Sequence, residues 1–422
     1  MKLDISKSSI QGVVEAPPSK SYTHRAIILA GLAMGESVIR KPLLSDDTLA
    51  TLKAMEQFGT VVKREGQDFI LRGGRLNAPL EEIDCGNSGT TLRLLTGIAS
   101  LLSSTVTLTG DASLQQRPMR PLLNALSSMG VSAKSSRNDG KAPILIRGPN
   151  EGRWTHIKGD ISSQFISSLL ISSALKDLDT EIILTTPLKS RPYVDMTIQM
   201  MEWFDGRCYE IKNGFRVQGG QTYRPYSLTI PGDYSSAAYP LVAGALAGKV
   251  TVKGLSLDDR QGDRKIVDIL ESFGVTISRG DDQITAEKGA LTANDVNLSD
   301  SPDLFPILAV LATQANGISR LYGASHLRHK ESDRIHATVT FLKTMGADIE
   351  EREDGCEVRG PTPLKGNKVE TTGDHRIMMA EAVAALIADG ATIINESESA
   401  SISYPSFVDD LRRLGANIGG DS

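Results

Sequence analysis

Two kinds of helical segment alternate along the chain, and they differ in where their apolar residues fall. The first kind consists almost wholly of apolar and small residues, as in AIILAGLA (26–33) and LVAGALAG (241–248). A helix without a polar face is expected in the interior of a domain. The second kind is amphipathic and more charged, as in LKAMEQFG (52–59), and we expect it nearer the surface. Short β-branched runs such as TVTL (105–108) follow the apolar segments and predict strands outside them.

The amphipathic segment always ends in the same way. A bulky apolar residue is followed by glycine, the residue that most often ends an α-helix. The pattern occurs six times, at Gly59, Gly130, Gly206, Gly274, Gly346 and Gly415. The intervals are roughly seventy residues, and such a regular period indicates a repeat architecture. The sequence therefore predicts six α/β units that together account for the whole chain.

Two breaks in the pattern indicate how the units are grouped. The first contains proline and serine, and the second contains proline and glycine. They lie at 16–20 and 230–233 and bracket the first three units. We expect hinge strands there, with residues 19–231 forming a domain inserted into a second domain made of 1–18 and 232–422. The chain length also favours two domains. The predicted fold class is α/β with buried helices and outer sheets, and a solenoid of six units in one line is the alternative.

Polar residues stand immediately before each buried helix. They are Ser19-Lys20-Ser21, Asn87-Ser88-Gly89-Thr90, Ser162-Ser163-Gln164, Asp233-Tyr234-Ser235-Ser236, Ser301-Pro302-Asp303 and Asp374-His375-Arg376. A buried helix needs its free N–H groups satisfied, so the serines taken singly can be explained as N-caps. Capping alone does not require the neighbouring cations Lys20, Arg25, Arg93 and Arg376. Helix N-termini with adjacent cations are typical of phosphate or carboxylate sites.

A second set of polar turns follows the strands of the repeat. They are Asp46-Asp47, Gln116-Arg117-Pro118, Ser190-Arg191-Pro192-Tyr193, Gln261-Gly262-Asp263 and His329-Lys330-Glu331-Ser332-Asp333-Arg334. The last turn can also be explained as a solvated charged face, with Lys330 and Arg334 flanking Glu331. Its position in the repeat favours a functional site. We therefore expect the helix starts and turns to line a cleft for small anionic substrates.

The composition excludes several classes of protein. A net charge of −5 argues against a general nucleic-acid-binding protein, because such proteins usually carry a basic surplus. The chain has neither a run of roughly eighteen apolar residues nor an apolar signal segment, so we expect neither a membrane span nor export. Cys85, Cys208 and Cys356 lie far apart, which favours a reducing cytoplasm over a disulfide framework.

The histidines and cysteines do not show the spacing of metal ligands, so we expect no metal and no other cofactor. We expect His329 and His336 at the surface. The glycine-rich loops of P-loop and Rossmann nucleotide sites are absent, as are the G-x-S-x-G motif of α/β-hydrolases and the H-E-x-x-H motif of zincins. These four enzyme classes are therefore disfavoured.

Seven motifs in order give the chain a family resemblance. They are PPSKSYTHRA (17–26), GNSGTTLRLL (86–95), QRPM (116–119), SSQFISSLL (162–170), SRPYVDMT (190–197), HKESDRI (329–335) and GDHRIMM (373–379). Over nearly its full length the chain resembles the 5-enolpyruvylshikimate-3-phosphate (EPSP) synthases. The resemblance implies the enolpyruvyl transferase fold, a two-domain inside-out α/β barrel of six units in which the first strand crosses into the C-terminal domain.

The resemblance also implies a reaction of the shikimate pathway, on the route to aromatic amino acids. Phosphoenolpyruvate reacts with the 5-hydroxyl of shikimate 3-phosphate by addition and elimination, and phosphate is released. Asp303 is at the family's position for the base that accepts the hydroxyl proton. Glu331 and Lys20 are the candidates for proton transfer at the methylene carbon. Because Lys330 and Arg334 should keep Glu331 ionised, Lys20 is favoured as the acid.

The family's binding residues also have counterparts in this sequence. Those that the resemblance assigns to phosphoenolpyruvate are Lys20, Gly89, Arg117, Gln164, Arg334 and Arg376. Those that it assigns to shikimate 3-phosphate are Ser21, Arg25, Ser162, Ser163, Gln164, Ser190, Tyr193, Asp303 and Lys330. Forked arginine donors suit carboxylates and phosphates. We expect these two small molecules as the only partners, and a monomer because one chain supplies the whole site.

Three positions depart from the family pattern, and two alternative functions remain. Ile402 lies where many members have a phosphate-binding lysine, His326 where asparagine is common, and Leu94 where proline is common. The related transferase that acts on UDP-N-acetylglucosamine typically has a cysteine in the loop corresponding to 111–116, and here that loop has none. A non-catalytic anion-binding protein is the other alternative. It would not need carboxylates such as Asp303 beside bound anions.

Overall fold

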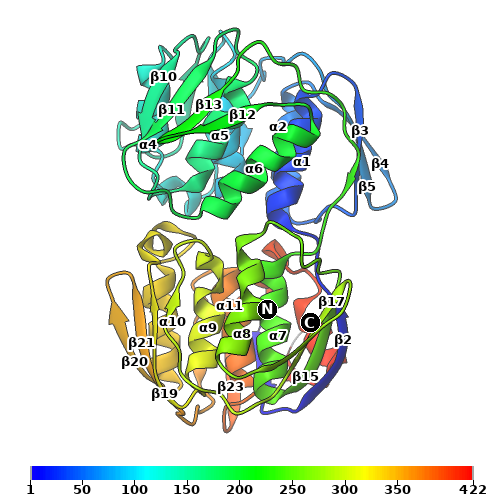
Figure 1. The fold of residues 1–422 in the computed structure, drawn as a ribbon, viewed down its shortest axis with the longest axis vertical. Helices are drawn as coiled ribbons and strands as arrows, with labels where there is room; N and C mark the ends of the chain where they lie inside the picture. The colour runs from blue at the N-terminus through cyan, green and yellow to red at the C-terminus, as the bar shows by residue number, and fades with distance from the viewer. Residues whose placement is uncertain (1, 421–422) are drawn as a thin grey trace. The chain divides into compact units, whose positions relative to one another are not determined.

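The computed structural model describes residues 2–420, which form an α/β structure of two compact units. We call them the inserted unit (Pro18–Ile230) and the terminal unit (Met1–Pro17 with Pro231–Ser422). The chain passes between them next to Pro18 and Pro231, inside the two segments in which the sequence has its breaks (Figure 1).

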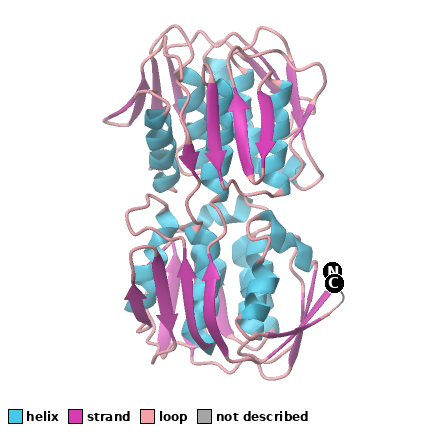
Figure 2. Cartoon of the chain, turned by 90° about the vertical axis from the view of Figure 1, so that its right-hand side faces the viewer, coloured by secondary structure: helices cyan, strands magenta, loops and turns pink. Residues whose placement is uncertain are grey.

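Each unit contains three buried helices. They are α1 (Lys20–Leu32), α3 (Gly89–Ala99) and α5 (Ser163–Ser173) in the inserted unit, and α7 (Tyr234–Ala247), α9 (Phe305–Ala312) and α11 (His375–Ala385) in the terminal unit. Nearly every side chain in them is buried, as the lack of a polar face predicts. Within each unit the strands lie outside these helices (Figure 2).

The amphipathic helices and short 3-10 turns lie between the strands of each repeat. The helices are α2 (Asp46–Gln57), α4 (Arg120–Ser128), α6 (Arg191–Trp203), α8 (Ile266–Ser272), α10 (Arg334–Thr344) and α12 (Phe407–Arg413). The turns are η1 (Leu114–Gln116), η2 (Gly262–Lys265), η3 (Pro302–Leu304), η4 (Ser325–His329) and η5 (Ser397–Ile402).

The inserted unit has three four-stranded sheets, with the orders β14-β3-β5-β4, β6-β7-β9-β8 and β10-β11-β13-β12. Their strands are β3 (Glu36–Arg40), β4 (Val61–Glu65), β5 (Asp68–Arg72), β6 (Ile83–Asp84), β7 (Val106–Thr109), β8 (Ser132–Ser135), β9 (Ile144–Arg147), β10 (Trp154–Ile157), β11 (Thr180–Leu184), β12 (Cys208–Ile211), β13 (Gly214–Val217) and β14 (Leu228–Thr229).

The terminal unit has three sheets of the same kind, with the orders β16-β17-β15-β2, β18-β19-β21-β20 and β22-β23-β1-β24. Their strands are β1 (Lys2–Ser6), β2 (Ile10–Glu15), β15 (Gly248–Lys253), β16 (Thr276–Arg279), β17 (Gln283–Glu287), β18 (Val296–Asn297), β19 (Gly317–Tyr322), β20 (Asp348–Arg352), β21 (Gly355–Gly360), β22 (Lys368–Val369), β23 (Ala391–Asn395) and β24 (Asn417–Gly419).

The six sheets share one topology, in which one parallel pair is followed by two antiparallel pairs. In four sheets the parallel edge strand directly precedes the buried helix of its own repeat. The other two edge strands are exchanged: β2 precedes α1 but pairs with β15, and β14 precedes α7 but pairs with β3. The two chain crossings between the units therefore coincide with two exchanged strands.

The amphipathic helices end where the glycine pattern predicts, with one difference. Five of the six glycines have a left-handed backbone, from φ +86° at Gly274 to +103° at Gly59 and Gly415. After α6 it is Asp205, with φ 63°, that takes this conformation instead of Gly206. Gly206 has another role: a Cβ atom there would lie 2.6 Å from the ring of Tyr223.

The predicted α/β class, with six repeats, buried helices and outer sheets, is confirmed. Between residues 2 and 420 the strands form six separate sheets and no closed barrel. The term inside-out barrel thus describes the helices inside each unit and the strands outside them, and not a closed sheet. Three repeats contribute to each unit, and the N-terminal strands β1 and β2 belong to the terminal unit.

Candidate active site

The starts of the buried helices combine capping residues with polar groups that do not cap. Ser88, Ser162, Asp233 and Asp374 accept hydrogen bonds from backbone N–H groups in the first turns of α3, α5, α7 and α11. Each of these four side chains therefore has a capping contact. Ser19 and Ser301, at the starts of α1 and η3, make no side-chain cap.

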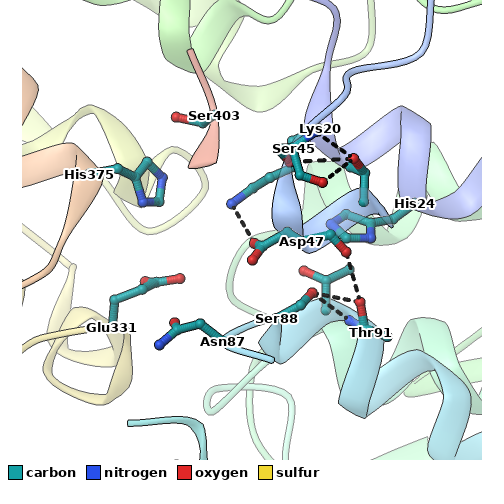
Figure 3. A network of polar contacts seen from close by, with 12 residues as sticks. Lys20, His24, Ser45, Asp47, Asn87, Ser88, Thr91, Glu331, His375 and Ser403 are labelled. Atoms are coloured by element: carbon teal, nitrogen blue, oxygen red, sulfur yellow. Dashed lines mark hydrogen bonds and ion pairs between the residues drawn. The ribbon is translucent and has the colours of Figure 1, made fainter. Parts of the chain in front are cut away.

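In the inserted unit, Lys20 forms an ion pair with an acidic residue of α2, the next helix along the chain. Its Nζ lies 3.1 Å from Oδ2 of Asp47, in the first turn of α2, and both side chains are largely buried. Thr51 and Thr91 join their hydroxyls at 2.6 Å, and Thr91 contacts the hydroxyl of Ser88. Figure 3 shows Ser88 and Thr91 beneath Asp47. The ammonium group of Lys20 is thus held at a defined place at the helix starts.

Arg117 lies over the start of α3. Its Nη2 donates to Oδ1 of Asn87, and a Cβ atom at residue 89 would lie 3.0 Å from its Nη1. Glycine at position 89 therefore allows Arg117 to lie close to the helix backbone. Gln164 joins the same region, since its Oε1 accepts from Arg93 at 2.7 Å and its Nε2 donates to the hydroxyl of Thr90 at 2.7 Å.

Arg25 is almost fully buried, with 1% of its surface exposed. It donates to the hydroxyl of Thr197 at 2.7 Å and to the carbonyl oxygens of Ser21 at 3.0 Å and Tyr193 at 3.2 Å. Burial lowers the pKa of Arg25 to about 10. These contacts join α1 to α6. Arg25 therefore has a structural task in addition to the binding role expected from the sequence.

The remaining candidates of the inserted unit lie at the starts of α5 and α6. Ser163 is buried, and Ser162 is the half-buried cap of its helix. Ser190 precedes α6 with a left-handed backbone, φ 54°, which is uncommon for a residue other than glycine. Its carbonyl oxygen accepts from the backbone N–H of Tyr193 at 3.2 Å.

In the terminal unit, Arg334 is the centre of a dense ion network. Its Nη1 lies 2.8 Å from Asp303, its Nη2 2.7 Å from Glu331 and its Nε 2.8 Å from Asp374. Only 2% of its side chain is exposed. The interpretation of residues 329–334 as a solvated charged face is therefore wrong for Arg334, because a tertiary site and not the solvent surrounds its guanidinium group.

Asp303 contacts three cations. Besides Arg334, Nζ of Lys330 lies 3.7 Å away and Nη2 of Arg376 lies 3.6 Å away. Burial alone would raise the pKa of Asp303, but the three cations outweigh burial and hold this pKa far below its usual value. We call Asp303, Lys330, Glu331, Arg334, Asp374 and Arg376 the Asp303 cluster.

Arg376 has donor groups available for a ligand. Its side chain is 3% exposed, and its Nε and Nη1 have no hydrogen-bond partner among residues 2–420. Burial by itself would lower the pKa of Arg376, yet Asp303 and other neighbours raise it above the usual value. A charged guanidinium group with unused donors in a buried site is suited to a carboxylate or phosphate.

Two acidic residues of the site were not assigned a role from the sequence. Asp47 holds Lys20, and Asp374 holds Arg334. Both lie in the polar segments at helix starts or turns, but the sequence does not show which cation each one contacts. A third, Asp263, is buried with its Oδ2 accepting from the hydroxyl of Ser235.

The structure locates the three positions that depart from the family pattern. Ile402 ends η5 and cannot supply a cation, Leu94 is buried in α3, and His326 is buried in η4. His329 and His336 are exposed, as predicted. In the described part of the chain we find no group of side chains suited to hold a metal ion. No described helix is long and apolar enough to span a bilayer.

Comparisons with known proteins agree over almost the whole length. A family model described as EPSP synthase (3-phosphoshikimate 1-carboxyvinyltransferase) matches residues 5–411. The 3-phosphoshikimate 1-carboxyvinyltransferase of Methanocorpusculum labreanum is 54% identical, with 99% of each chain covered. The enzyme of the same name from Methanocaldococcus jannaschii is 45% identical, with 97% of each chain covered.

Solved structures give the same result for the fold. The EPSP synthase from Acinetobacter baumannii superposes with a TM-score of 0.82 at 26% identity, over 99% of this chain and all of that one. The enolpyruvyl transferase NikO from Streptomyces tendae has a TM-score of 0.81 at 19% identity, over 99% and 98% of the two chains.

Proposed function

Because the chain belongs to the EPSP synthase family, we propose that it transfers the enolpyruvyl group of phosphoenolpyruvate to the 5-hydroxyl of shikimate 3-phosphate and releases phosphate. This reaction belongs to the synthesis of aromatic amino acids by the shikimate pathway. The observation that carries the proposal is the Asp303 cluster. It places an ionised carboxylate among three cations, with unused donors on Arg376.

Asp303 is the proposed base for the 5-hydroxyl proton. In the free protein its three cationic neighbours make it a weak base. Phosphoenolpyruvate and shikimate 3-phosphate would bring anionic groups to these cations and offset part of their charge. The affinity of Asp303 for a proton would then rise when both substrates are bound, at the moment when a proton must be accepted.

Proton transfer at the methylene carbon is assigned to Lys20 and Glu331. Glu331 accepts a hydrogen bond from Arg334 at 2.7 Å, a contact that favours its ionised form. We therefore assign the first protonation to Lys20. Glu331 is the second candidate for proton transfer at this carbon. Elimination then breaks the bond between the neighbouring carbon and phosphate, and the proton that leaves the methyl carbon passes to Lys20 or Glu331, the two candidates for proton transfer at this carbon.

The residues that we assign to the substrates come from both units. Lys20, Gly89, Arg117 and Gln164 of the inserted unit, with Arg334 and Arg376 of the terminal unit, would bind phosphoenolpyruvate. Shikimate 3-phosphate would be bound by Ser21, Arg25, Ser162, Ser163, Gln164, Ser190, Tyr193, Asp303 and Lys330. We propose closure of the units about residues 16–20 and 230–233, which would exclude water and strengthen ionic contacts.

Cellular context and assembly are part of the same proposal. The three cysteines are unpaired, which supports a reducing cytoplasm as the place of action. We further propose a monomer, because one chain contains every residue assigned to the two substrates.

The proposed function is tested with purified protein and phosphoenolpyruvate, to which either shikimate 3-phosphate or UDP-N-acetylglucosamine is added. Phosphate release with shikimate 3-phosphate alone is the expected result. Release only with the sugar nucleotide would move the protein to the related transferase. Release with neither, together with calorimetric binding of the anions, would favour a non-catalytic binding protein.

A further inference from the structure

A second contact joins α1 and α2 one helical turn beyond the ion pair of Lys20 and Asp47. His24 follows Lys20 by one turn on α1, and Thr51 follows Asp47 by one turn on α2, so each lies on the same helix face as its predecessor. Nδ1 of His24 lies 2.7 Å from the hydroxyl oxygen of Thr51. Figure 3 shows His24 together with the ion pair. The two helices are therefore held together by two polar contacts at successive turns.

The second contact continues to α3 through buried hydroxyl groups. The hydroxyl oxygens of Thr51 and Thr91 are 2.6 Å apart, and those of Thr91 and Ser88 are also 2.6 Å apart. Ser88 in turn caps α3, since its hydroxyl accepts from the backbone N–H of Thr91 at 3.1 Å. We call His24, Thr51, Thr91 and Ser88 the His24 row. All four side chains are fully buried, and they link α1, α2 and α3 near the starts of these helices.

The contacts fix the direction of each hydrogen bond in the His24 row. In its contact with Ser88, Thr91 is the donor and uses its one hydroxyl proton. Two oxygens 2.6 Å apart need a proton between them, so Thr51 must donate to Thr91. Nδ1 of His24 must then supply the proton of the remaining contact. Both threonine hydroxyls also lie near the carbonyl of Asp47, but at 3.4 and 3.3 Å these contacts are much the weaker ones.

The other ring nitrogen of His24 agrees with this tautomer. Nε2 is buried and has no hydrogen-bond partner among residues 2–420. A proton on Nε2 would leave a buried N–H donor unpaired, which is costly. A charged ring would also lie near two other cations: burial, and next the charges of Lys20 and Arg25, lower the pKa of His24 well below its usual value. The ring is therefore neutral, with its proton on Nδ1.

We propose that His24 is a positioning residue of the transferase reaction, which as a neutral Nδ1–H donor begins a one-way row of hydrogen bonds that sets the spacing of the starts of α1, α2 and α3. Lys20 is the first residue of α1 and Gly89 the first of α3, and both are assigned to phosphoenolpyruvate. The row would thus place the two against each other. The kinetic part of this inference rests on the proposed function, whereas the tautomer is a property of the free protein.

The kinetic test compares His24→Leu with His24→Asn. Leucine has no donor, whereas the amide nitrogen of asparagine can take the place of Nδ1. We expect His24→Leu to raise KM for phosphoenolpyruvate roughly tenfold, because small displacements of binding groups are costly. KM for shikimate 3-phosphate should change less than about twofold, since most of its assigned residues lie outside the three helix starts. His24→Asn should restore the wild-type value for phosphoenolpyruvate.

A merely structural role would give a different result. Loss of folded protein lowers the apparent kcat but leaves the KM of the surviving enzyme unchanged for both substrates. The proposal is overturned if His24→Leu keeps the wild-type KM for phosphoenolpyruvate, if both KM values rise equally, or if His24→Asn is no better than His24→Leu.

Thr51→Val interrupts the same row at its middle with little change of shape. It should raise KM for phosphoenolpyruvate as His24→Leu does, and the double variant should be no worse than either single variant, because one break suffices. Thr96→Val is the matched control. Thr96 is another buried threonine of the inserted unit, but its hydroxyl donates to the carbonyl of Leu92 in its own helix, at 2.6 Å. Both KM values should stay at wild type in the control, and additive effects of His24→Leu and Thr51→Val would contradict a shared row.

Nitrogen-15 NMR on the free protein determines the tautomer without any turnover, with the His24 signals assigned by their absence in His24→Asn. At neutral pH we expect a protonated Nδ1 and an unprotonated Nε2. A proton on Nε2, alone or with one on Nδ1, overturns the inference even if the enzyme is active. Absence of wild-type turnover would instead contradict the proposed function and the kinetic role with it, while the NMR signals would still report on the direction of the row.

Discussion

Asp303 and Glu331 share a single guanidinium group, since both are within 2.8 Å of Arg334. Asp303→Asn removes the proposed proton acceptor, and Glu331→Gln removes a candidate for proton transfer at carbon. We expect each to lower kcat by roughly a hundredfold or more, the order that general acid–base groups contribute. Phosphate release gives kcat, and calorimetry should show that the substrates still bind.

Glu350→Gln is the matched control for these two variants. Glu350 belongs to the same unit and also pairs with an arginine, but its side chain is 65% exposed. Its replacement should leave kcat unchanged, because exposed ion pairs contribute little. If Asp303→Asn or Glu331→Gln turned over at a near-normal rate, that residue would have no place in the mechanism.

Glu381 gives a prediction about stability. Its carboxyl oxygens are buried and have no hydrogen-bond partner among the described residues. Burial, and next the charge of Asp374, raise its pKa to about 9, against about 4.3 in an unfolded chain. Between these values the folded protein holds a proton that the unfolded chain has lost, so stability falls as pH rises.

Glu381→Gln should therefore be more stable than the wild type, and the gain should increase from about pH 5 to about pH 9. At neutral pH we expect a difference on the order of 3 kcal/mol, because each unit of pKa corresponds to about 1.4 kcal/mol. Denaturant unfolding at several pH values measures it. A gain that is the same at all pH values would show that Glu381 does not hold a proton in the folded protein.

Single residues also mark the limit of what the sequence could predict. The polar segments containing Asp303, Glu331 and Arg334 were identifiable from the repeat and from the motifs. Their contacts were not, because Arg334 and Asp374 are 40 positions apart and Lys20 and Asp47 are 27 apart. Which carboxylate holds which cation depends on how the elements pack, and sequence spacing alone does not contain that information.

At the scale of elements the sequence was more informative, because helix ends obey local rules. Six amphipathic helices ending in glycine could be predicted without tertiary structure. The exception also has a local cause. After α6, Asp205 adopts the left-handed backbone, which aspartate tolerates better than most residues, and Gly206 instead makes room for Tyr223.

Gly130, after α4, tests the cost of a side chain at such a helix end. Its φ is +88°, and an added Cβ would meet no atom within 4 Å. Gly130→Ala should thus be strained only by its backbone, and we expect it to lower stability by about 1 kcal/mol. The unfolding midpoint of the inserted unit measures the loss.

Gly419→Ala serves as the control for this substitution. Gly419 lies in β24 without a left-handed backbone, and a Cβ there would be at an ordinary contact distance of 3.9 Å from Asp4. Its replacement should be neutral within about 0.5 kcal/mol. Equal losses in the two variants would contradict the argument, because side-chain addition and not backbone conformation would then be the cause.

At the scale of the whole molecule, the number and order of the repeats followed from the sequence, but the pairing of the strands did not. β2 and β14 have the same place in their repeats as the other edge strands, and yet they pair with β15 and β3. Hydrophobic patterns do not distinguish an exchanged strand from a local one, since both bury the same side chains against an equivalent neighbour. The breaks at 16–20 and 230–233 and the family resemblance both assign the N-terminal segment to the second domain, but neither identifies the strands with which β2 and β14 pair.

The exchange makes the two units unequal in their dependence on the rest of the chain. All three sheets of the inserted unit are built from strands between Glu36 and Thr229, inside one continuous segment. The terminal unit needs β1 and β2 from the N-terminal end to complete two of its sheets. We therefore expect a fragment of residues 18–230 to fold by itself with a single cooperative transition, and residues 231–422 alone to fail to do so.

Circular dichroism and hydrogen exchange on the two fragments measure this difference. Addition of a peptide of residues 1–17 should restore protected amides in β15 and β23, because it supplies the partners of these two strands. The isolated inserted unit should still bind phosphate-bearing anions weakly through Lys20 and Arg117. It should release no phosphate from phosphoenolpyruvate, since Asp303 is absent from it. An unfolded 18–230 fragment would mean that the inserted unit depends on contacts beyond its own sheets, against the topology.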